Sequence, residues 1–239
     1  NEETKKFLEK LPPFPLDVSI AAYYLKVTNV PYNKYLESLH QYKKDFSDLQ
    51  ERLLKELGDY TKTRYGIITL SLQHLMSTHK DFGDLLLFIS LLDSQNIPRD
   101  LLNKYKSDEV IDSFIYHLKK YSLITNEERP ATNSISTFSV HRSTQAISLN
   151  YLTKILNLEK NIPLIQAISS TLENYADNII HEENLSKMKS IVSHCEVFLN
   201  HSDLWNDITK ASIEGVLGGI YFHLAHYTKA RKTLEDSLV

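Results

Sequence analysis

The chain has 239 residues, 42% of them hydrophobic, which is enough for one large core or a few small ones. With 27 Lys and Arg against 30 Asp and Glu, the net charge is −3, so no overall positive field favours nucleic acid or an anionic membrane. One cysteine excludes an internal disulfide framework, and no apolar run approaches the roughly 20 residues of a membrane helix. The chain opens on Asn rather than Met and shows no signal peptide, so we expect a segment of a longer cytoplasmic protein.

The first 58 residues predict a compact bundle of helices. Glu2–Leu11 has its apolar residues on one side and is stopped by a proline-rich stretch, because proline lacks the N–H that a helix needs. A largely apolar helix follows from Leu16, and Pro31 fits the first position of the next helix. A further apolar stripe is closed by Gly58, which suits a helix C-cap.

Residues 59–157 predict a winged-helix domain, in which several helices precede two strands joined by a loop. Apolar residues recur at helical spacing over Ile67–Met76, and Leu85–Leu92 predicts a helix that is buried nearly all round. A short helix begins at Pro98. An amphipathic helix follows, and Asp108 suits its N-cap.

The two strands flank a polar loop, Asn126–Ser134, which would form the wing. The second strand, Thr137–Val140, alternates apolar and polar residues, and a helical period starts directly after His141. A histidine and an arginine, Arg142, therefore stand where a strand passes into a helix, which is a rigid and accessible place to touch a ligand. The alternative interpretation is a histidine that only closes the strand and hydrogen-bonds its own backbone.

Residues 158–206 predict a helical linker and residues 207–239 a truncated tetratricopeptide-like repeat. Pro163 begins one linker helix, and Asn184 suits the N-cap of the next. The repeat spacing is carried by Leu217, Gly218, Tyr221, Ala225, Tyr227, Ala230 and Leu234. Glu214 and Ser237 depart from the consensus. One repeat cannot bury its outer face, so we expect further repeats and a protein ligand for this region.

No catalytic constellation is present, so the chain is not expected to be an enzyme by itself. His194 and Cys195 are neighbours on a predicted helix and point about 100° apart, which prevents a nucleophile–base pair. His223 and His226 are expected to share a helical face, but no HExxH or paired CxxC spacing accompanies them, so we expect no metal site. A GxxxxGK[ST] phosphate loop is also missing from the sequence.

The stretches Pro13–Asp17, Ile68–Leu72 with Leu91–Pro98, and Val140–Arg142 follow one another in an order that resembles the motifs of STAND NTPases of the NB-ARC type that carry tetratricopeptide repeats. Pro13–Asp17 with Ile20–Leu25 looks like the Gly-Leu-Pro-Leu motif that opens the first helical domain. Ile68–Leu72 and Leu91–Pro98 are similar to the path into the winged helix, and Val140–Arg142 stands at the place of the Met-His-Asp motif. The resemblance covers nearly the whole chain, and its specificity comes from the order and spacing of the motifs.

The resemblance implies a mainly α fold with four units. These are a first helical domain over 1–58, a winged helix with a small β-wing over 59–157, a helical linker over 158–206 and a repeat hairpin over 207–239. The nucleotide-binding domain would precede Asn1, so ADP or ATP is expected only in the full-length parent, which would be the ATPase.

The resemblance also implies which residues meet the nucleotide. Pro15 would pack on the adenine with Leu16 nearby, and His141 would reach the β-phosphate of ADP, where Arg142 could add a charge-assisted contact. Proline stands at 13 in place of the motif's glycine, and Arg142 in place of its aspartate.

The first hypothesis is therefore a regulatory segment of a nucleotide-switched signalling ATPase. It would hold ADP against the upstream domain of the same chain and present its repeats to a protein partner. One alternative is a DNA-binding winged-helix regulator, although the predicted helix Asp108–Tyr121 has a mixed-charge face, which makes nucleic acid an unfavoured partner. The other is a helical scaffold with no nucleotide link; no membrane partner is expected.

Overall fold

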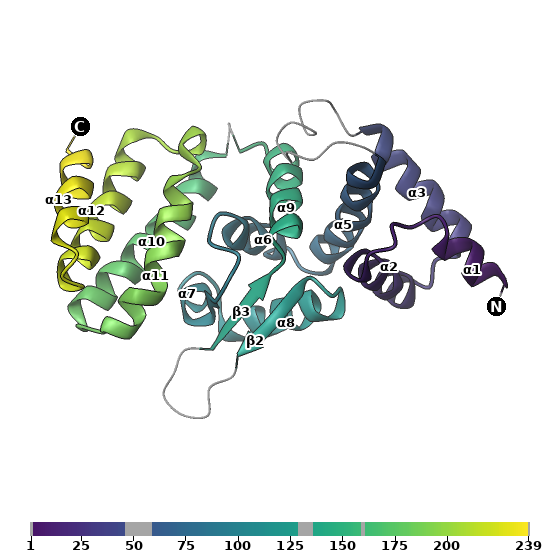
Figure 1. Cartoon of the computed structure of the whole chain (residues 1–239), viewed down its shortest axis with the longest axis horizontal. Coiled ribbons are helices and arrows are strands. Elements are labelled where there is room, and N and C mark those ends of the chain that lie inside the picture. The colour runs from purple at the N-terminus through teal and green to yellow at the C-terminus, as the bar shows by residue number, and fades with distance from the viewer. Residues whose placement is uncertain (1, 46–58, 129–135, 159–160, 239) are drawn as a thin grey trace.

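The computed structural model describes residues 2–45, 59–128, 136–158 and 161–238 and is mainly helical with a small antiparallel sheet (Figure 1). The N-terminal elements are α1 (Glu2–Leu8), α2 (Pro15–Thr28) and α3 (Tyr32–Asp45). The middle group is α5 (Asp59–Thr78), α6 (Phe82–Ser90), β1 (Ile97–Pro98), α7 (Arg99–Asn103), α8 (Asp108–Lys120), β2 (Ile124–Glu128), β3 (Thr137–Val140) and α9 (Arg142–Ile155). The C-terminal group is α10 (Ile162–His181), α11 (Leu185–Leu199), a 3-10 turn η1 (Ser202–Leu204), α12 (Asp207–His223) and α13 (Tyr227–Asp236). The three groups follow one another along the long axis, with the chain ends at opposite ends of the molecule.

Aromatic rings hold the N-terminal group together. Phe7 of α1 is buried and stacks on Tyr32 with ring centroids 4.6 Å apart, and Tyr35 meets Phe7 edge-on at 5.8 Å. The first helix ends at Leu8, before the proline-rich stretch, so the predicted end at residue 11 was late. Pro31 is the residue before α3, because its carbonyl accepts the N–H of Tyr35 at 3.0 Å, and the predicted first helical position was wrong by one. The stripe closed by Gly58 lies outside the described residues.

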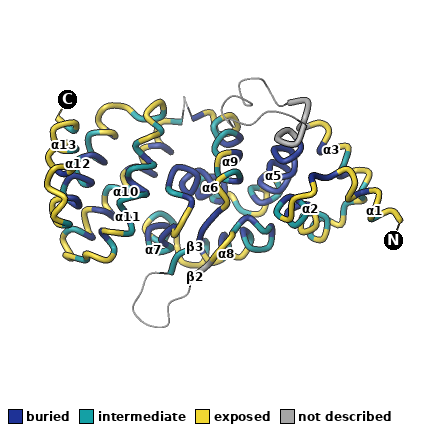
Figure 2. Tube along the Cα trace, viewed as in Figure 1, coloured by how far each residue is buried: buried dark blue, intermediate teal, exposed yellow. Residues whose placement is uncertain are grey.

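Helix α5 packs against helices of both the N-terminal and the middle group. Residues 63–72 are all buried, because α2 and α3 cover one side of this helix while α6 and α9 cover another (Figure 2). Helix α6 is buried along nearly its whole length, as its continuous apolar run predicted. Polar side chains in these helices bond back to the preceding turn, as Ser71 Oγ does to the Ile67 carbonyl at 3.3 Å.

The sheet has the order β1-β3-β2, all antiparallel. The first strand, which pairs Ile97 with Phe138, was not predicted, because two residues that end in proline give no strand period. The second strand continues to Glu128, so the polar stretch expected from Asn126 as a loop begins as paired β structure. Residues 129–134 of the predicted loop lie outside the described residues.

Helix caps were predicted with mixed success. Asn184 caps α11, since its Oδ1 accepts the N–H of Lys187 at 3.1 Å, as expected. Ser107, rather than Asp108, precedes α8; Asp108 is the first helical residue, where its charge favours the positive helix end, and it accepts a hydrogen bond from Asn103. For α8 the residue preference therefore predicted the start of the helix but placed the N-cap one residue too late.

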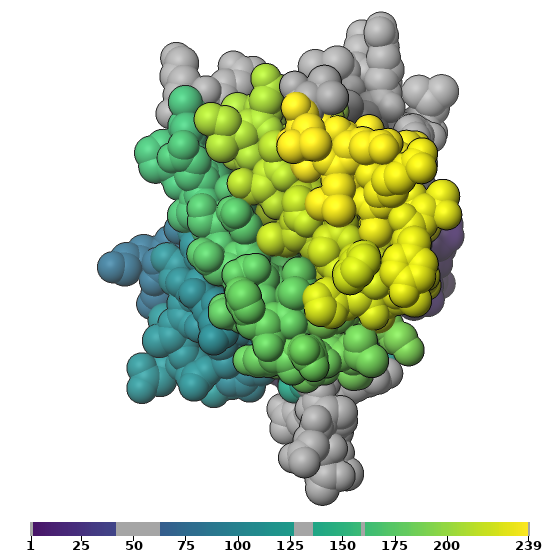
Figure 3. Space-filling view, turned by 90° about the vertical axis from the view of Figure 1, so that its left-hand side faces the viewer, coloured from purple at the N-terminus to yellow at the C-terminus, as the bar shows by residue number. Residues whose placement is uncertain are grey.

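The C-terminal helices lie side by side, and α13 is the outermost of the group (Figure 3). Its one buried residue is Ala230, whereas Tyr227 and Leu234 are 62% and 40% exposed. Trp205, in the segment before α12, stacks on Phe198 of α11 at 4.1 Å and donates its indole N–H to the Phe198 carbonyl at 2.8 Å.

Candidate functional site

One buried arginine connects the start of α2 with the start of α9. Arg64, on α5, binds both carboxylate oxygens of Asp17, with Nε to Oδ1 at 3.0 Å and Nη2 to Oδ2 at 3.2 Å. Its Nη1 donates to Ser143 Oγ at 3.4 Å. The two helix starts that the sequence marked as nucleotide-contacting are thereby held by a single guanidinium.

The residues predicted for the adenine lie at one side of Arg64. Pro15 is the first residue of α2 and is exposed, while Leu16 is half-buried and packs against the core. The ring of Phe14, 46% exposed, lies 5.7 Å from Arg64 Cζ, a distance typical of a cation–π contact. Phe14, one residue before Pro15, and Asp17, two residues after it, therefore both contact Arg64.

The residues predicted for the phosphate lie at the other side. His141 is exposed and occupies the N-cap of α9, with its Nδ1 accepting the Ser143 N–H at 3.3 Å and lying 2.8 Å from Ser143 Oγ. Because Nδ1 accepts, the neutral ring carries its proton on Nε2, which is then the donor that can meet an anion. Arg142, also exposed, is the first helical residue.

The charge at the start of α9 favours an anion. The first turn of the helix contains no acidic residue, and Arg142 adds a positive charge to the unpaired N–H groups of the helix end. A capping histidine and these groups can bind a phosphate. The same geometry also satisfies the alternative interpretation, in which His141 closes the strand and bonds its own backbone.

Sequence reasoning missed Arg64 and Ser143. Asp17 offered a signal, because a carboxylate inside an apolar helical stretch needs a cation when it is buried, and Asp17 is 0% exposed. Its partner lies 47 residues away in sequence, so only the fold identifies it.

One groove lies in the N-terminal group, and a small space lies beside the start of α9. A groove of about 610 Å³ runs between α1, α2 and the start of α3, and its lining includes Phe7, Val18, Leu25 and Tyr32 but none of the four predicted nucleotide residues. The space beside Val140 and Thr144 is about 10 Å³, which is close to the size of one water. Neither of these two cavities is lined by the predicted nucleotide residues, which are exposed or half-buried at the starts of α2 and α9.

The other pairs of residues considered for catalysis or metal binding do not form sites in the fold. His194 and Cys195 are both buried, and His194 Nε2 bonds the Asn96 carbonyl rather than the thiol. The expectation of a shared face for His223 and His226 was wrong, because one ends α12 and the other precedes α13. Within residues 2–45, 59–128, 136–158 and 161–238, no group of three His, Cys, Asp or Glu side chains gathers to hold a metal ion. None of the helices described here is long and apolar enough to cross a bilayer.

Comparison with known proteins gives no relative: no family model, no curated protein and no solved structure matches the chain.

Proposed function

We propose that this chain is the regulatory and interaction segment of a nucleotide-switched signalling ATPase of the NB-ARC type. In this proposal α1–α3 belong to the first helical domain, and α5–α9 with the sheet form the winged helix. Helices α10 and α11 form the linker, and α12–α13 form a tetratricopeptide-like hairpin. ADP binds in the parent protein, between these helices and an upstream nucleotide-binding domain.

The observation that carries the proposal is the bridge made by Arg64. A clamp on one nucleotide needs its adenine contact and its phosphate contact at a fixed separation. Asp17 and Ser143, each two residues from a predicted contact residue, are bonded to the same guanidinium at 3.0 and 3.4 Å. The starts of α2 and α9 are therefore fixed relative to each other before any ligand arrives.

The side chains at the starts of α2 and α9 also support the proposal. Pro15 presents a rigid apolar face suited to a base, and the His141 Nε2–H is a short-range donor suited to a phosphate oxygen. Loss of one charge-assisted hydrogen bond weakens binding by about 1.5–3 kcal/mol, or roughly 10- to 150-fold.

The test is ADP retention in the parent protein, followed with a fluorescent ADP. We expect His141→Ala to release ADP roughly 10-fold faster or more. His181→Ala is the matched control, because His181 is an exposed histidine at a helix end far along the chain. Equal release from the parent, the His141 variant and the control would return His141 to the role of a strand-closing residue. Sub-micromolar ATP binding by the 239-residue chain alone would also contradict the proposal.

A further inference from the structure

The turn between α6 and β1, residues 91–96, meets three separate elements. Toward β3, the Asn96 N–H donates to Ser139 Oγ at 3.0 Å and the Val140 N–H donates to the Ser94 carbonyl at 2.8 Å. Toward α9, the Gln145 side-chain amide donates to the Leu92 carbonyl at 2.7 Å. These bonds fix the chain on both sides of His141, one residue before it and four residues after it.

The third element is α11, which reaches the same turn through His194. The His194 ring is 1% exposed, and its Nε2 lies 3.2 Å from the Asn96 carbonyl. A carbonyl only accepts, so Nε2 carries the proton and the neutral ring leaves Nδ1 as an acceptor. Among the described residues, that Nδ1 has no hydrogen-bond partner.

Burying a histidine whose Nδ1 makes no hydrogen bond costs free energy of folding, because that nitrogen loses its bond to water. An apolar side chain would pack there without an unsatisfied atom. What the imidazole adds is the bond to Asn96, a residue in the left-handed region with φ 54°. The contact therefore holds this turn from the side of the C-terminal helices.

We propose that His194 is a positioning residue that couples the C-terminal helices to His141 through the turn 91–96. The connection runs from His194 to Asn96, from the turn to Val140 and Gln145, and so to the strand–helix junction between them. A movement of α11 that breaks the His194–Asn96 bond loosens the turn 91–96, to which the junction is bonded on both sides. The coupling stands on these contacts alone; its consequence for nucleotide rests on the proposed function.

The electrostatic surroundings make the contact sensitive to pH. Burial lowers the pKa of His194, although the Asn96 hydrogen bond and the Asp93 carboxylate act in the opposite direction. Asp100 of α7 also faces α11, where Lys187 neutralises it at 2.7 Å. Because the folded pKa lies below the unfolded value of about 6.5, the packing of the neutral His194 ring is fully stabilising above that pH and loses stability as the pH falls below it, while Nε2–H remains a donor in both protonation states.

Amide hydrogen exchange in the 239-residue chain tests the coupling. His194→Leu removes the donor, and we expect the Asn96 and Val140 amides to lose protection by roughly three- to tenfold, the effect of one net hydrogen bond. His194→Gln places an amide N–H at the position of Nε2 and should restore the protection. Tyr175→Phe is the matched control, because it removes a different bond of the same interface, from the Tyr175 hydroxyl to Asp100 at 2.7 Å.

The contrary outcomes are equally definite. Unchanged protection at Asn96 and Val140 in His194→Leu, or the same loss in Tyr175→Phe, would overturn the coupling. If His194→Leu does not fold, acidification serves instead. Between pH 6.5 and 5, the two amides should lose protection in the wild type and keep it in His194→Gln; equal behaviour overturns the proposal.

A final measurement separates this inference from the proposed function. In the parent protein, His194→Leu should speed ADP release while Tyr175→Phe should not. Loss of protection without faster release would leave the coupling standing and would contradict the nucleotide role of His141.

Discussion

The α-carbon of Gly218 on α12 lies directly against the side chain of Leu234 on α13. A β-carbon placed on Gly218 would lie 2.6 Å from Leu234 Cγ and 2.7 Å from Cδ2, closer than van der Waals contact permits. A β-carbon placed on Gly215, three residues earlier in the same helix, would meet nothing within 4 Å among the described residues. The two glycines, about one turn apart on α12, therefore differ in the room that they leave for a side chain. Only Gly218 is required for the close approach of α12 and α13.

We expect the two alanine variants to change stability in opposite directions. Gly215→Ala should stabilise by about 0.5–1 kcal/mol, because alanine loses less backbone entropy in a helix. Gly218→Ala should destabilise by about 1 kcal/mol, since overpacking outweighs that gain. Urea unfolding measures both, and Gly218→Ala with Leu234→Ala should recover part of the loss. A stabilising Gly218→Ala would show that α13 is free to move away.

The ion pair between Asp17 and Arg64 gives the second prediction. Asp17 is fully buried and the Arg64 side chain is 10% exposed, so removing the Asp17 carboxylate breaks a buried ion pair. Asp17→Ala should cost about 3–5 kcal/mol in the free energy of unfolding. The control is Glu2→Ala, which breaks the exposed pair with Lys6 and should cost less than about 0.5 kcal/mol. Similar losses in the two variants would mean that water reaches the inner pair.

A structural feature could be predicted from the sequence when it depends on neighbouring residues, and could not when it depends on residues far apart in the chain. The helical period and the caps are local, so α10 and α11 were predicted nearly as they are and cap errors were of one residue, whereas the helix predicted over Leu85–Leu92 begins earlier, at Phe82, and ends at Ser90. The strand–helix junction at His141 was also local and was predicted correctly. The contacts that join elements are different in kind. Arg64 meets Asp17 across 47 residues and His194 meets Asn96 across 98, and no periodicity encodes such partners.

The lone thiol gives the third prediction. Burial raises the pKa of Cys195 to about 12, with the Glu196 carboxylate adding to the effect, so little thiolate forms at neutral pH. The native chain should react with a thiol-specific disulfide reagent at pH 8 only as fast as it unfolds, and should react at once in denaturing urea. Following the reaction at rising urea concentration gives the measurement. Rapid labelling in buffer would mean that α11 opens locally, well below the free energy of global unfolding.

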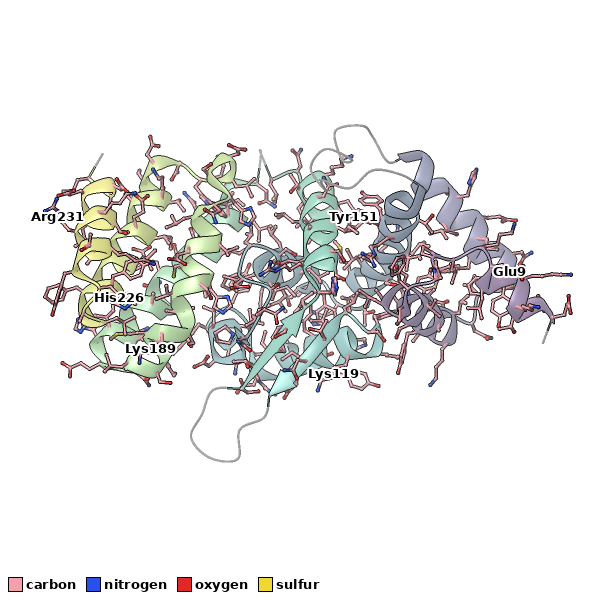
Figure 4. The ribbon with its side chains drawn as sticks, in the orientation of Figure 1. Glu9, Lys119, Tyr151, Lys189, His226 and Arg231 are labelled. Carbon is pink, nitrogen blue, oxygen red and sulfur yellow. The ribbon has the colours of Figure 1, made fainter. Side chains whose placement is uncertain are left out.

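Asp100 joins the C-terminal helices to the middle group, and this gives the last prediction. Its carboxylate accepts one hydrogen bond from the Tyr175 hydroxyl of α10, at Oδ1, and one from the Lys187 ammonium of α11, at Oδ2, each 2.7 Å long. In Figure 4 the labelled Lys189 and Arg231 lie in the C-terminal group and Tyr151 lies in the middle group, on the two sides of the junction between these groups. One side chain therefore anchors two helices across it.

Asp100→Ala should uncouple the two groups on unfolding. Trp205 lies in the C-terminal group, so its fluorescence reports on that part, whereas far-UV circular dichroism reports on all helices. In the wild type the two transitions in urea should coincide; in the variant the fluorescence midpoint should fall below the other by an amount equivalent to about 1–3 kcal/mol. Asp112→Ala is the control, because Asp112 pairs with Arg99 inside the middle group and is mostly exposed. Coincident transitions in Asp100→Ala would mean that apolar packing alone holds the junction, since Ile168, Leu172 and Ile191 are buried in the same helices.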